Sequence, residues 1–466
     1  MLFLENDIKL DDISNYKHIH MVAIGGISMS GVAEILKNWG FYVTGSDANR
    51  SEITDKLLKN GISVVIGHDL ENTEKADLIV YSAAVKQDDP ELVLAREKNI
   101  PVVERCDFVG YLTRKFKNTI GVSGTHGKTT TTSMLSLCFI EAGLDPTIQV
   151  GALLEQIGGN YRVGNSDYFI LEACEYVESF LKFSPKTEII LNIDNDHLDY
   201  FKNFENIKKA FIKYTKLLPE NGLLVVNGDD KNCLDLSQYT TSKCITYGIK
   251  NEKADFVAKN ISFDQNGFTN FDVYKQDDFF MKVVLSVPGL HNVLNALSCV
   301  ALCTEYSISK EMIQIALKKY TGAHRRFEYV GSYNNINVYD DYGHHPTEIK
   351  ATANALQHKT YSESWVVFQP HTYSRLKNLL PDFAEALLGF DHIIVTDVYA
   401  AREKNNYGIS SKDLVSKIKE SKENVVYISD FSEIVNYLKK NAKEKDIILT
   451  LGAGTVTDIG PMILAS

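Results

Sequence analysis

A glycine-bearing loop between an apolar run and a helical pattern constrains this chain more than any other stretch. The apolar run, residues 119–122, is typical of a β-strand, and residues 129–142 carry an apolar stripe typical of a helix. Residues 124–129 between them read Gly-Thr-His-Gly-Lys-Thr. Such glycines let backbone N–H groups turn inward, while the helix N-terminus and Lys128 add positive charge. The sequence therefore predicts a phosphate-binding loop, with the Thr129 hydroxyl available to Mg²⁺.

The loop departs from the usual phosphate-loop pattern, G-x-x-x-x-G-K-[ST], at one position. Val122 stands where the first glycine is expected, so the glycines of this loop are Gly124 and Gly127. An ordinary strand-to-helix turn is the alternative interpretation. The strand pattern before the loop and the helix pattern after it favour phosphate binding.

The length of 466 residues is too great for one hydrophobic core and predicts about three domains. Three successive stretches alternate strand and helix patterns, and they divide the chain into residues 1–113, 114–323 and 324–466. We expect an α/β protein with a Rossmann-like N-terminal domain and a central phosphate-loop domain built on a mainly parallel sheet. A Rossmann-like C-terminal domain is expected to follow.

Composition and charge exclude several classes of function. The net charge of −11 argues against a protein that binds along a nucleic-acid backbone. No apolar run reaches the roughly 18 residues that span a bilayer, and the acidic residues of the N-terminus, 1–12, are unlike a signal peptide. The seven cysteines form no C-x-x-C pair and are most simply reduced thiols. We expect a cytoplasmic protein that binds neither nucleic acid nor a membrane.

The N-terminal stretch has the layout of a nucleotide-binding fold. A glycine-rich segment, residues 25–31, joins a strand pattern at 18–24 to a helix pattern at 28–39, and Asp47 closes the next strand. Backbone N–H groups at a helix start suit a pyrophosphate, and a carboxylate there suits a ribose.

This N-terminal pattern is an imperfect one. Ala23 and Ser28 stand where glycine is commoner in G-x-G-x-x-G, so a plain strand-to-helix turn remains an alternative. His68 and Ser82 lie at apparent strand ends on the same edge of the sheet. His68 is either part of a ligand site or a solvated loop histidine.

Polar side chains follow two strand patterns in the central stretch. Glu172 follows the apolar run 168–171, and His197 closes the segment after the run 188–193. Carboxylate oxygens suit Mg²⁺, and an imidazole completes such a site or holds a water; local hydrogen bonding is the alternative. Further along, a cluster opens a helix whose amides suit either a nucleotide base or helix capping: His291, Asn292 and Asn295.

The C-terminal stretch carries twin histidines, His344 and His345, directly before Pro346. They suggest zinc at first sight, but no cysteine or third histidine stands at ligand spacing, and a helix N-terminus explains the run. Arg375 and Arg402 are either clamps for an anionic ligand or members of surface salt bridges.

Taken in chain order, nine motifs resemble those of the Mur ligases, and the resemblance runs nearly from end to end. They are GGISMSG (25–31), GTHGKTT (124–130), EACE (172–175), NIDNDH (192–197), HNVLN (291–295), HRRF (324–327), DDYGHHPTE (340–348), FQPH (368–371) and AREK (401–404). The phosphate loop is common to all Mur ligases and to folylpolyglutamate synthases. The motifs at 340–348 and 368–371 narrow the resemblance to the branch that joins L-alanine to UDP-N-acetylmuramate.

The resemblance implies an ATP-dependent amide ligase of peptidoglycan synthesis, with one domain each for a UDP-sugar, ATP and an amino acid. It implies that Lys128 and Arg326 stabilise phosphate charge, and that Thr129, Glu172 and His197 hold Mg²⁺. It assigns further ATP contacts to Gly124, Thr125, His126, Gly127, Thr130, His291, Asn292, Asn295 and Asp341. It assigns the UDP-sugar to Gly25, Gly26, Ser28, Met29, Ser30, Gly31, Asp47, His68 and Ser82, and the amino acid to Tyr342, His344, His371 and Arg375.

The residues fit the chemistry of such a ligase. A carboxylate is too poor an electrophile to meet an amine directly, so it first attacks the γ-phosphate of ATP to give an acyl phosphate. Every step accumulates negative oxygen, which lysine, arginine, Mg²⁺ and backbone amides stabilise. The chemistry requires no serine, cysteine or lysine nucleophile.

The sequence also departs from the family and leaves alternatives. Thr372 stands where an arginine is frequent in this branch, and Lys213 is out of register for the carbamylated lysine of other Mur ligases, so we expect no such modification. A murein-tripeptide recycling ligase and a non-catalytic nucleotide-binding regulator remain alternatives. A folylpolyglutamate synthase is a more distant one, because the N-terminal glycine-rich domain argues against it.

Overall fold

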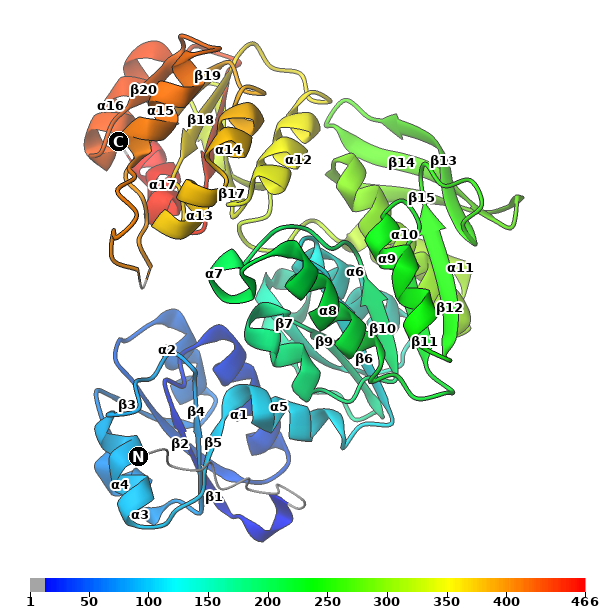
Figure 1. Ribbon diagram of the computed structural model, residues 1–466, viewed down its shortest axis with the longest axis vertical. Helices are drawn as coiled ribbons and strands as arrows, with labels where there is room; N and C mark the ends of the chain where they lie inside the picture. The colour runs from blue at the N-terminus through cyan, green and yellow to red at the C-terminus, as the bar shows by residue number, and fades with distance from the viewer. Residues whose placement is uncertain (1–12, 402, 466) are drawn as a thin grey trace.

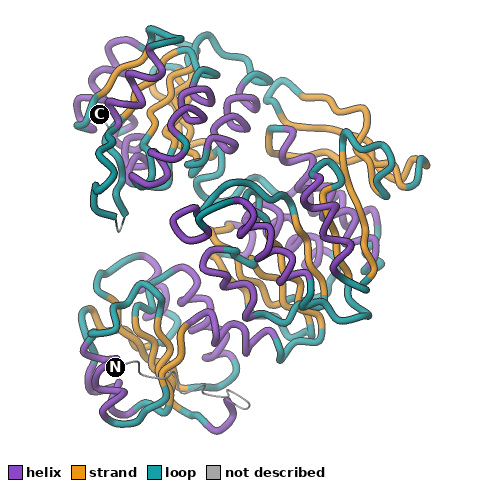
Figure 2. Tube along the Cα trace, in the orientation of Figure 1, coloured by secondary structure: helices purple, strands orange, loops and turns teal. Residues whose placement is uncertain are grey.

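The computed structural model describes residues 13–401 and 403–465 as three lobes, each built on one β-sheet (Figure 1). The expectations for the acidic N-terminus and for Arg402 concern residues outside these ranges. Helices flank the sheet of each lobe, although the strands at one end of the central sheet project from its edge (Figure 2), and the arrangement confirms the predicted three-domain α/β fold. The boundaries proposed after residues 113 and 323 fall just beyond helices and stay predictions.

The N-terminal lobe is a five-stranded parallel sheet in the order β3-β2-β1-β4-β5. The chain runs from β1 to β2 toward one edge of the sheet and from β4 to β5 toward the other edge. The loops after β1 and β4 therefore border the crevice where such folds bind ligands. The strands are β1 (His18–Val22), β2 (Tyr42–Asp47), β3 (Ser63–Ile66), β4 (Leu78–Tyr81) and β5 (Val102–Glu104). The helices are α1 (Ile27–Asn38), α2 (Glu52–Lys59), α3 (Leu70–Lys75), α4 (Pro90–Glu97) and α5 (Arg105–Thr113).

The central lobe has a ten-stranded sheet, β15-β14-β13-β12-β11-β10-β6-β9-β7-β8, whose middle strands are parallel. The strands are β6 (Asn118–Ser123), β7 (Thr147–Leu154), β8 (Gly159–Arg162), β9 (Tyr168–Glu172), β10 (Thr187–Ile190), β11 (Leu223–Asn227), β12 (Lys243–Gly248), β13 (Phe256–Phe263), β14 (Phe268–Lys275) and β15 (Asp278–Pro288). The helices are α6 (Lys128–Glu141), α7 (Leu198–Phe201), α8 (Phe204–Thr215), α9 (Lys231–Asp235), α10 (Leu290–Glu305) and α11 (Lys310–Lys319).

The C-terminal lobe has a six-stranded sheet, β16-β17-β21-β18-β19-β20, in which only the edge strand β16 is antiparallel. The strands are β16 (Glu328–Tyr333), β17 (Ile336–Asp341), β18 (Ser364–Phe368), β19 (His392–Val395), β20 (Val425–Tyr427) and β21 (Ile447–Leu451). The helices are α12 (Pro346–Leu356), α13 (Tyr373–Asn378), α14 (Leu380–Leu387), α15 (Ser411–Lys419), α16 (Phe431–Asn441) and α17 (Ile459–Leu464).

Short 3-10 turns complete the described chain: η1 (Ile13–Asn15), η2 (Glu155–Ile157), η3 (Tyr176–Lys182), η4 (Leu236–Tyr239) and η5 (Thr455–Asp458). The seven cysteines are all free. In the parts of the chain that the structure describes, no helix combines the length and the apolar character needed to cross a bilayer.

Two local signals show how the sequence sets helix boundaries in the C-terminal lobe. Helix α12 begins where expected, with Pro346 in its first turn and a capping box between His345 and Glu348. The sequence pattern over residues 374–387 predicts a single helix, and this prediction is wrong, because the structure has two helices there. The chain breaks between α13 and α14, because Pro381 has no N–H for a continuing helix and its ring crowds the preceding turn.

The core of the central lobe contains one carboxyl group in an unfavourable setting. Glu188 lies on β10, is fully buried, and neither of its side-chain oxygens has a hydrogen-bond partner among the described residues. The hydroxyl of the nearby Tyr214 is also without one. Burial raises the pKa of Glu188 well above that of a free glutamate.

We expect Glu188→Met, which keeps the length of the side chain, to stabilise the protein, and more so at pH 8 than at pH 5. The folded state holds the Glu188 proton, whereas the unfolded chain releases it above about pH 4.3, so the wild type loses stability as pH rises. A buried polar group without a partner costs about 1–3 kcal/mol. Urea unfolding at both pH values measures the gain, and the exposed Glu252→Met is the control. An equal gain at both pH values would contradict this account.

Candidate active site

The phosphate loop connects β6 to α6 and depends on two glycines with left-handed backbone angles. Gly124 has φ of +133° and Gly127 has φ of +88°, values that favour glycine strongly. A Cβ atom on Gly127 would also lie 2.7 Å from Oδ1 of Asn295. The loop is tied to the next strand connection, because the His126 N–H donates to Oδ1 of Asn192 at 2.8 Å. Any side chain at residue 127 would therefore disturb both the loop and α10.

Lys128 is buried at the start of α6 and is paired with a carboxylate. Its Nζ donates to Oε2 of Glu175 at 2.9 Å and to the carbonyl oxygens of Gly124 and Thr125 at 2.5 and 3.1 Å. Burial alone would lower the pKa of Lys128, but Glu175 outweighs it and raises that pKa above the ordinary value. Lys128 is therefore a fixed cation inside the loop.

Thr129 and Glu172 meet beside this loop. The Thr129 hydroxyl donates to Oε2 of Glu172 at 3.3 Å, and the N–H of Gly151 on β7 donates to Oε1 at 2.5 Å. Burial raises the pKa of Glu172, although Gly151 and Lys128 partly oppose it. The hydroxyl and the carboxylate are two hard oxygen ligands side by side, a setting that a divalent cation would stabilise.

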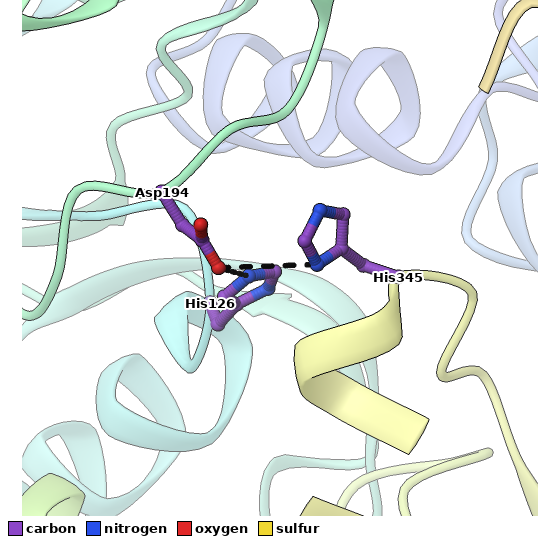
Figure 3. A group of neighbouring side chains, drawn as sticks. All are labelled: His126, Asp194 and His345. Atoms are coloured by element: carbon purple, nitrogen blue, oxygen red, sulfur yellow. Dashed lines mark hydrogen bonds and ion pairs between the residues drawn. The ribbon is translucent and has the colours of Figure 1, made fainter. Parts of the chain in front are cut away.

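A contact between the central and C-terminal lobes surrounds Asp194, which follows β10 (Figure 3). Its Oδ2 lies 3.2 Å from Nε2 of His126 and 3.9 Å from Nδ1 of His345, and it accepts a hydrogen bond from the Thr347 hydroxyl at 2.6 Å. Burial would lower the pKa of His126, but Asp194 and Glu348 raise it to about 9, so the ring is a cation at neutral pH.

His345 has both ring nitrogens engaged within this contact. Its Nε2 lies 2.9 Å from the carbonyl oxygen of Asn195, and its Nδ1 accepts the Thr347 N–H at 3.3 Å as part of the α12 cap. The histidine thus connects the start of α12 to the loop after β10. The twin histidines therefore serve a helix N-terminus, as the sequence predicted, and join two lobes as well.

Glu348 interacts with several cationic and hydrogen-bond donor groups at this contact between the central and C-terminal lobes. Its carboxylate lies 3.5 Å from Nδ1 of His126 and 3.8 Å from Nη1 of Arg326, and it accepts the His344 N–H at 3.0 Å. Arg326 also lies over the ring of Tyr342, 5.3 Å from its centre. These interactions hold the pKa of Glu348 well below its usual range, against the effect of burial. Arg326 is therefore a cation, 30% exposed, held through Glu348 beside the histidine of the phosphate loop.

A cavity of about 1310 Å³ opens above the loop between the central and C-terminal lobes. Its walls include predicted nucleotide residues from three distant segments: His126, Gly127, Thr130, His291, Asn292, Asn295, Arg326 and Asp341. Burial lowers the pKa of His291 to about 4, so that ring is neutral. The Asn292 amide donates to the Pro288 carbonyl at 2.7 Å and its oxygen accepts from Asn295 at 3.1 Å. The structure therefore brings eight of the predicted ATP residues to one cavity, whereas Gly124, Thr125, Lys128 and Thr129 are not among its lining residues.

Asp341 lies in the wall of this cavity at the end of β17. Its carboxylate accepts N–H hydrogen bonds from Gly343 at 2.6 Å and Phe327 at 3.0 Å. Burial raises its pKa to about 6, although Arg326 opposes the shift. Asp341 thus orders the chain around Arg326 and also reaches the cavity.

A second cavity of about 360 Å³ lies between α7 and α13. Arg375 borders it and pairs with Asp196, with Nη2 2.8 Å from Oδ1, and both side chains are only 10% exposed. Nη1 of Arg375 lies 3.0 Å from Nδ1 of His371. The pair is therefore largely buried and bridges two lobes, and it is not the surface salt bridge that the sequence also allowed.

The histidines near Arg375 are uncharged at neutral pH. Burial lowers the pKa of His371 to about 4 and that of His344 to about 3, and their rings lie 5.4 Å apart. Thr372, at the position of the expected arginine, has φ of +67°, an unfavourable angle for a β-branched residue. Among the described residues that line this cavity, only Arg375 is an arginine or lysine.

His197 lies in the smaller cavity and not with the other two predicted metal ligands. Its ring packs on Tyr176, with centres 4.5 Å apart, and its Nε2 lies 3.8 Å from Oδ2 of Asp196. Thr129 and Glu172 contact each other directly. The structure therefore joins two of the three predicted ligands and sets the third between the lobes.

The predicted UDP-sugar residues meet at the carboxyl edge of the N-terminal sheet. Asp47 accepts the Gly25 N–H at 2.8 Å, and a Cβ on Gly25 would lie 2.8 Å from the same oxygen, so the glycine segment packs on this carboxylate. Gly26 precedes α1, whose first turn contains Ser28, Met29, Ser30 and Gly31. The first N–H groups of a helix have no partner within it and suit an anion.

His68 and Ser82 border the same edge of the N-terminal sheet. The half-exposed His68 places Nδ1 3.3 Å from Oε2 of the buried Glu91, which also accepts the Ser46 hydroxyl at 2.7 Å. Ser82 directly follows β4, and its hydroxyl accepts the Ala84 N–H at 3.3 Å.

Sequence reasoning missed the carboxylates that partner the predicted cations: Glu175, Asp194, Asp196 and Glu348. All four stand within the quoted motifs, and for the first three the proximity to strand ends was the available signal. Glu348 stands three residues after His345, the spacing of a capping box. That signal predicts a helix start and says nothing about Arg326.

Comparisons with known proteins cover almost the whole chain. Residues 18–117 match the Mur ligase family catalytic domain, 122–303 the Mur ligase middle domain, and 325–454 the domain described as Mur ligase, glutamate ligase domain. The chain is 50% identical over 453 residues, 97% of each chain, to the UDP-N-acetylmuramate–L-alanine ligase of Acetivibrio thermocellus. The chain belongs to the Mur ligase family.

Other relatives agree with this assignment. This Mur ligase is 47% identical to the UDP-N-acetylmuramate–L-alanine ligase of Clostridium acetobutylicum, over 98% of this chain and 99% of the relative. The crystal structure of the UDP-N-acetylmuramate-alanine ligase MurC from Thermotoga maritima superposes with a TM-score of 0.81 at 30% identity, covering 97% and 98% of the two chains. A murein peptide ligase from Psychrobacter arcticus shares the fold, with a TM-score of 0.70 at 24% identity and coverage of 96% and 98%.

Proposed function

We infer that this Mur ligase joins L-alanine to UDP-N-acetylmuramate at the expense of ATP, in the synthesis of peptidoglycan precursors. The observation that carries this inference is the 50% identity to an L-alanine ligase over 97% of both chains. The geometry supports it, because a nucleotide-sized cavity adjoins the phosphate loop and a smaller cavity with Arg375 adjoins both lobes. The substrates are therefore small molecules.

The proposed reaction has two steps. The UDP-sugar carboxylate attacks the γ-phosphorus of ATP, the bond to the bridging oxygen breaks, and ADP leaves with the electron pair. The amine of alanine then attacks the acyl carbon, loses a proton, and inorganic phosphate leaves. Negative charge builds on phosphate oxygens in the first step, and we assign its stabilisation to Lys128, inside the loop, and to Arg326, which lines the large cavity.

We propose Mg²⁺ as the metal of this reaction. Thr129 and Glu172 would hold it, because a hydroxyl and a carboxylate already converge there and both are hard oxygen donors. His197 would approach from the neighbouring cavity, as the resemblance implies. When bound, the metal neutralises phosphate charge.

The remaining site residues are proposed to bind the nucleotide, the UDP-sugar and alanine. The nucleotide would contact the phosphate loop, His291, Asn292, Asn295 and Asp341 in the large cavity. The UDP-sugar would lie on the glycine segment beside Asp47, His68 and Ser82, and alanine beside His344, His371, Arg375 and Tyr342. We further propose a cytoplasmic location, where ATP and reduced thiols are found, in line with the seven free cysteines.

Phosphate release against a panel of amine substrates tests this function. With ATP, Mg²⁺ and UDP-N-acetylmuramate present, we expect L-alanine to have the highest kcat/KM. Glycine lacks one methyl group and should be about 10–200-fold worse. A higher kcat/KM for the L-alanyl-γ-D-glutamyl-diaminopimelate tripeptide would indicate a recycling ligase, and ATP binding without amine-dependent phosphate release would indicate a regulator.

A further inference from the structure

A buried amide ties the glycine segment of the N-terminal lobe to the central lobe. Gln149 lies on β7 and is 7% exposed, and its Nε2 donates to the Ser28 carbonyl at 3.0 Å and the Ser28 hydroxyl oxygen at 2.7 Å. Arg105 donates to the same hydroxyl oxygen at 3.0 Å, and Asn160 donates to the Ile27 carbonyl. Ser28, which replaces the expected glycine, is therefore a point of attachment between lobes.

The same strand reaches the predicted metal site two residues later. Gly151 on β7 donates its N–H to Oε1 of Glu172 at 2.5 Å, and a Cβ on Gly151 would lie 2.7 Å from Oε2. In a strand, residues two apart are separated by about 6.6 Å. Gln149 is also the register partner of Leu171, the residue before Glu172 on the adjacent strand β9. Gln149 thus lies two residues from the Gly151 contact along β7, and its register partner Leu171 directly precedes Glu172 on β9.

We propose that Gln149 is a positioning residue that couples the UDP-sugar site to the nucleotide–metal site. This inference rests on the proposed function, which places the UDP-sugar on the glycine segment and Mg²⁺ at Glu172. A ligand that immobilises the glycine segment immobilises Ser28, and through Gln149 it fixes the register of β7 and the Gly151 N–H that orients Glu172. Coupling of this kind is reciprocal, so the nucleotide also strengthens binding of the UDP-sugar.

Gln149→Met tests the coupling, because methionine preserves the side-chain length and removes both hydrogen bonds. The readout is the Kd of a non-hydrolysable ATP analogue with Mg²⁺, measured with and without saturating UDP-N-acetylmuramate. We expect the UDP-sugar to tighten nucleotide binding by about 5-fold or more in the wild type, a typical size for coupled sites. In the variant that ratio should fall to near one, while each ligand alone binds within a few-fold of wild type.

Lys56→Met is the matched control, since Lys56 joins the same two lobes through the Gly158 carbonyl at 2.6 Å, outside β7. It should keep the wild-type ratio. Should Gln149→Met not fold, Ser28→Gly removes the shorter of the two Gln149 hydrogen bonds, together with the Arg105 contact inside the N-terminal lobe, and should lower the ratio in part. A wild-type ratio of one, an unchanged ratio in Gln149→Met, or an equal loss in Lys56→Met would each overturn the coupling. Failure of the wild type to form product with alanine would instead overturn the proposed function.

Discussion

Replacing Lys128 with alanine should lower kcat for alanine-dependent phosphate release by at least about 100-fold. The side chain is a buried cation in the phosphate loop, where charge accumulates on the transferred phosphoryl group. A charge fixed in a water-poor site needs no reorganisation during reaction, so its removal affects the transition state more than the bound substrate. The effect should therefore appear mainly in kcat, measured by coupled phosphate release at saturating substrates.

The structure also offers a way to separate catalysis from stability in this variant. Lys128→Ala leaves Glu175, which is 2% exposed, without its partner, and an unpaired buried charge destabilises the fold. Combining Lys128→Ala with Glu175→Gln should restore thermal stability and leave kcat low. The exposed Lys117, paired with Asp167 on the surface, gives a control in which Lys117→Ala changes neither. Recovery of turnover in the double variant would show that Lys128 acts only through the fold.

The phosphate loop was predictable because every signal for it is local. A buried strand, two glycines and a helix start lie within residues 118–141, and the structure places them as expected. The strand and helix order of the three lobes was predictable for the same reason. Residues 374–387 show the limit of such local signals. The pattern predicts one helix there, whereas the structure has two, with Pro381 in the first turn of the second.

The partners of the predicted cations were not predictable, because they depend on how the lobes meet. Arg375 and Asp196 are 179 residues apart in the chain, and His126 and Glu348 lie in different lobes. No periodicity or motif spacing encodes such distances. The contact between His197 and Tyr176 is likewise set by tertiary packing, and the role of His197 as a metal ligand stays a prediction. Local patterns thus predicted which residues can bind a ligand or take part in catalysis, whereas tertiary packing determines which side chains each of them contacts.

Replacing Arg375 with methionine should lower kcat/KM for alanine by about 100-fold or more, as expected for loss of a largely buried charged contact. Arg375 borders the smaller cavity, and its planar group suits recognition of a carboxylate. His344 and His371 are neutral there, and Thr372 carries no charge, so among the described residues Arg375 is the cation that this cavity offers to the carboxylate of alanine. The measurement is kcat/KM for alanine at saturating ATP and UDP-N-acetylmuramate.

Alaninamide, which has the amine of alanine without its negative charge, makes this test specific. The wild type should prefer alanine strongly, whereas Arg375→Met should use both with similar kcat/KM, because the group that distinguishes them is gone. Lys377→Met, at an exposed position of the same helix, should keep the preference. Arg375→Met also leaves Asp196 unpaired, but that defect would slow both substrates equally. A variant that is slower and still prefers alanine would assign Arg375 to the contact between lobes and not to the substrate.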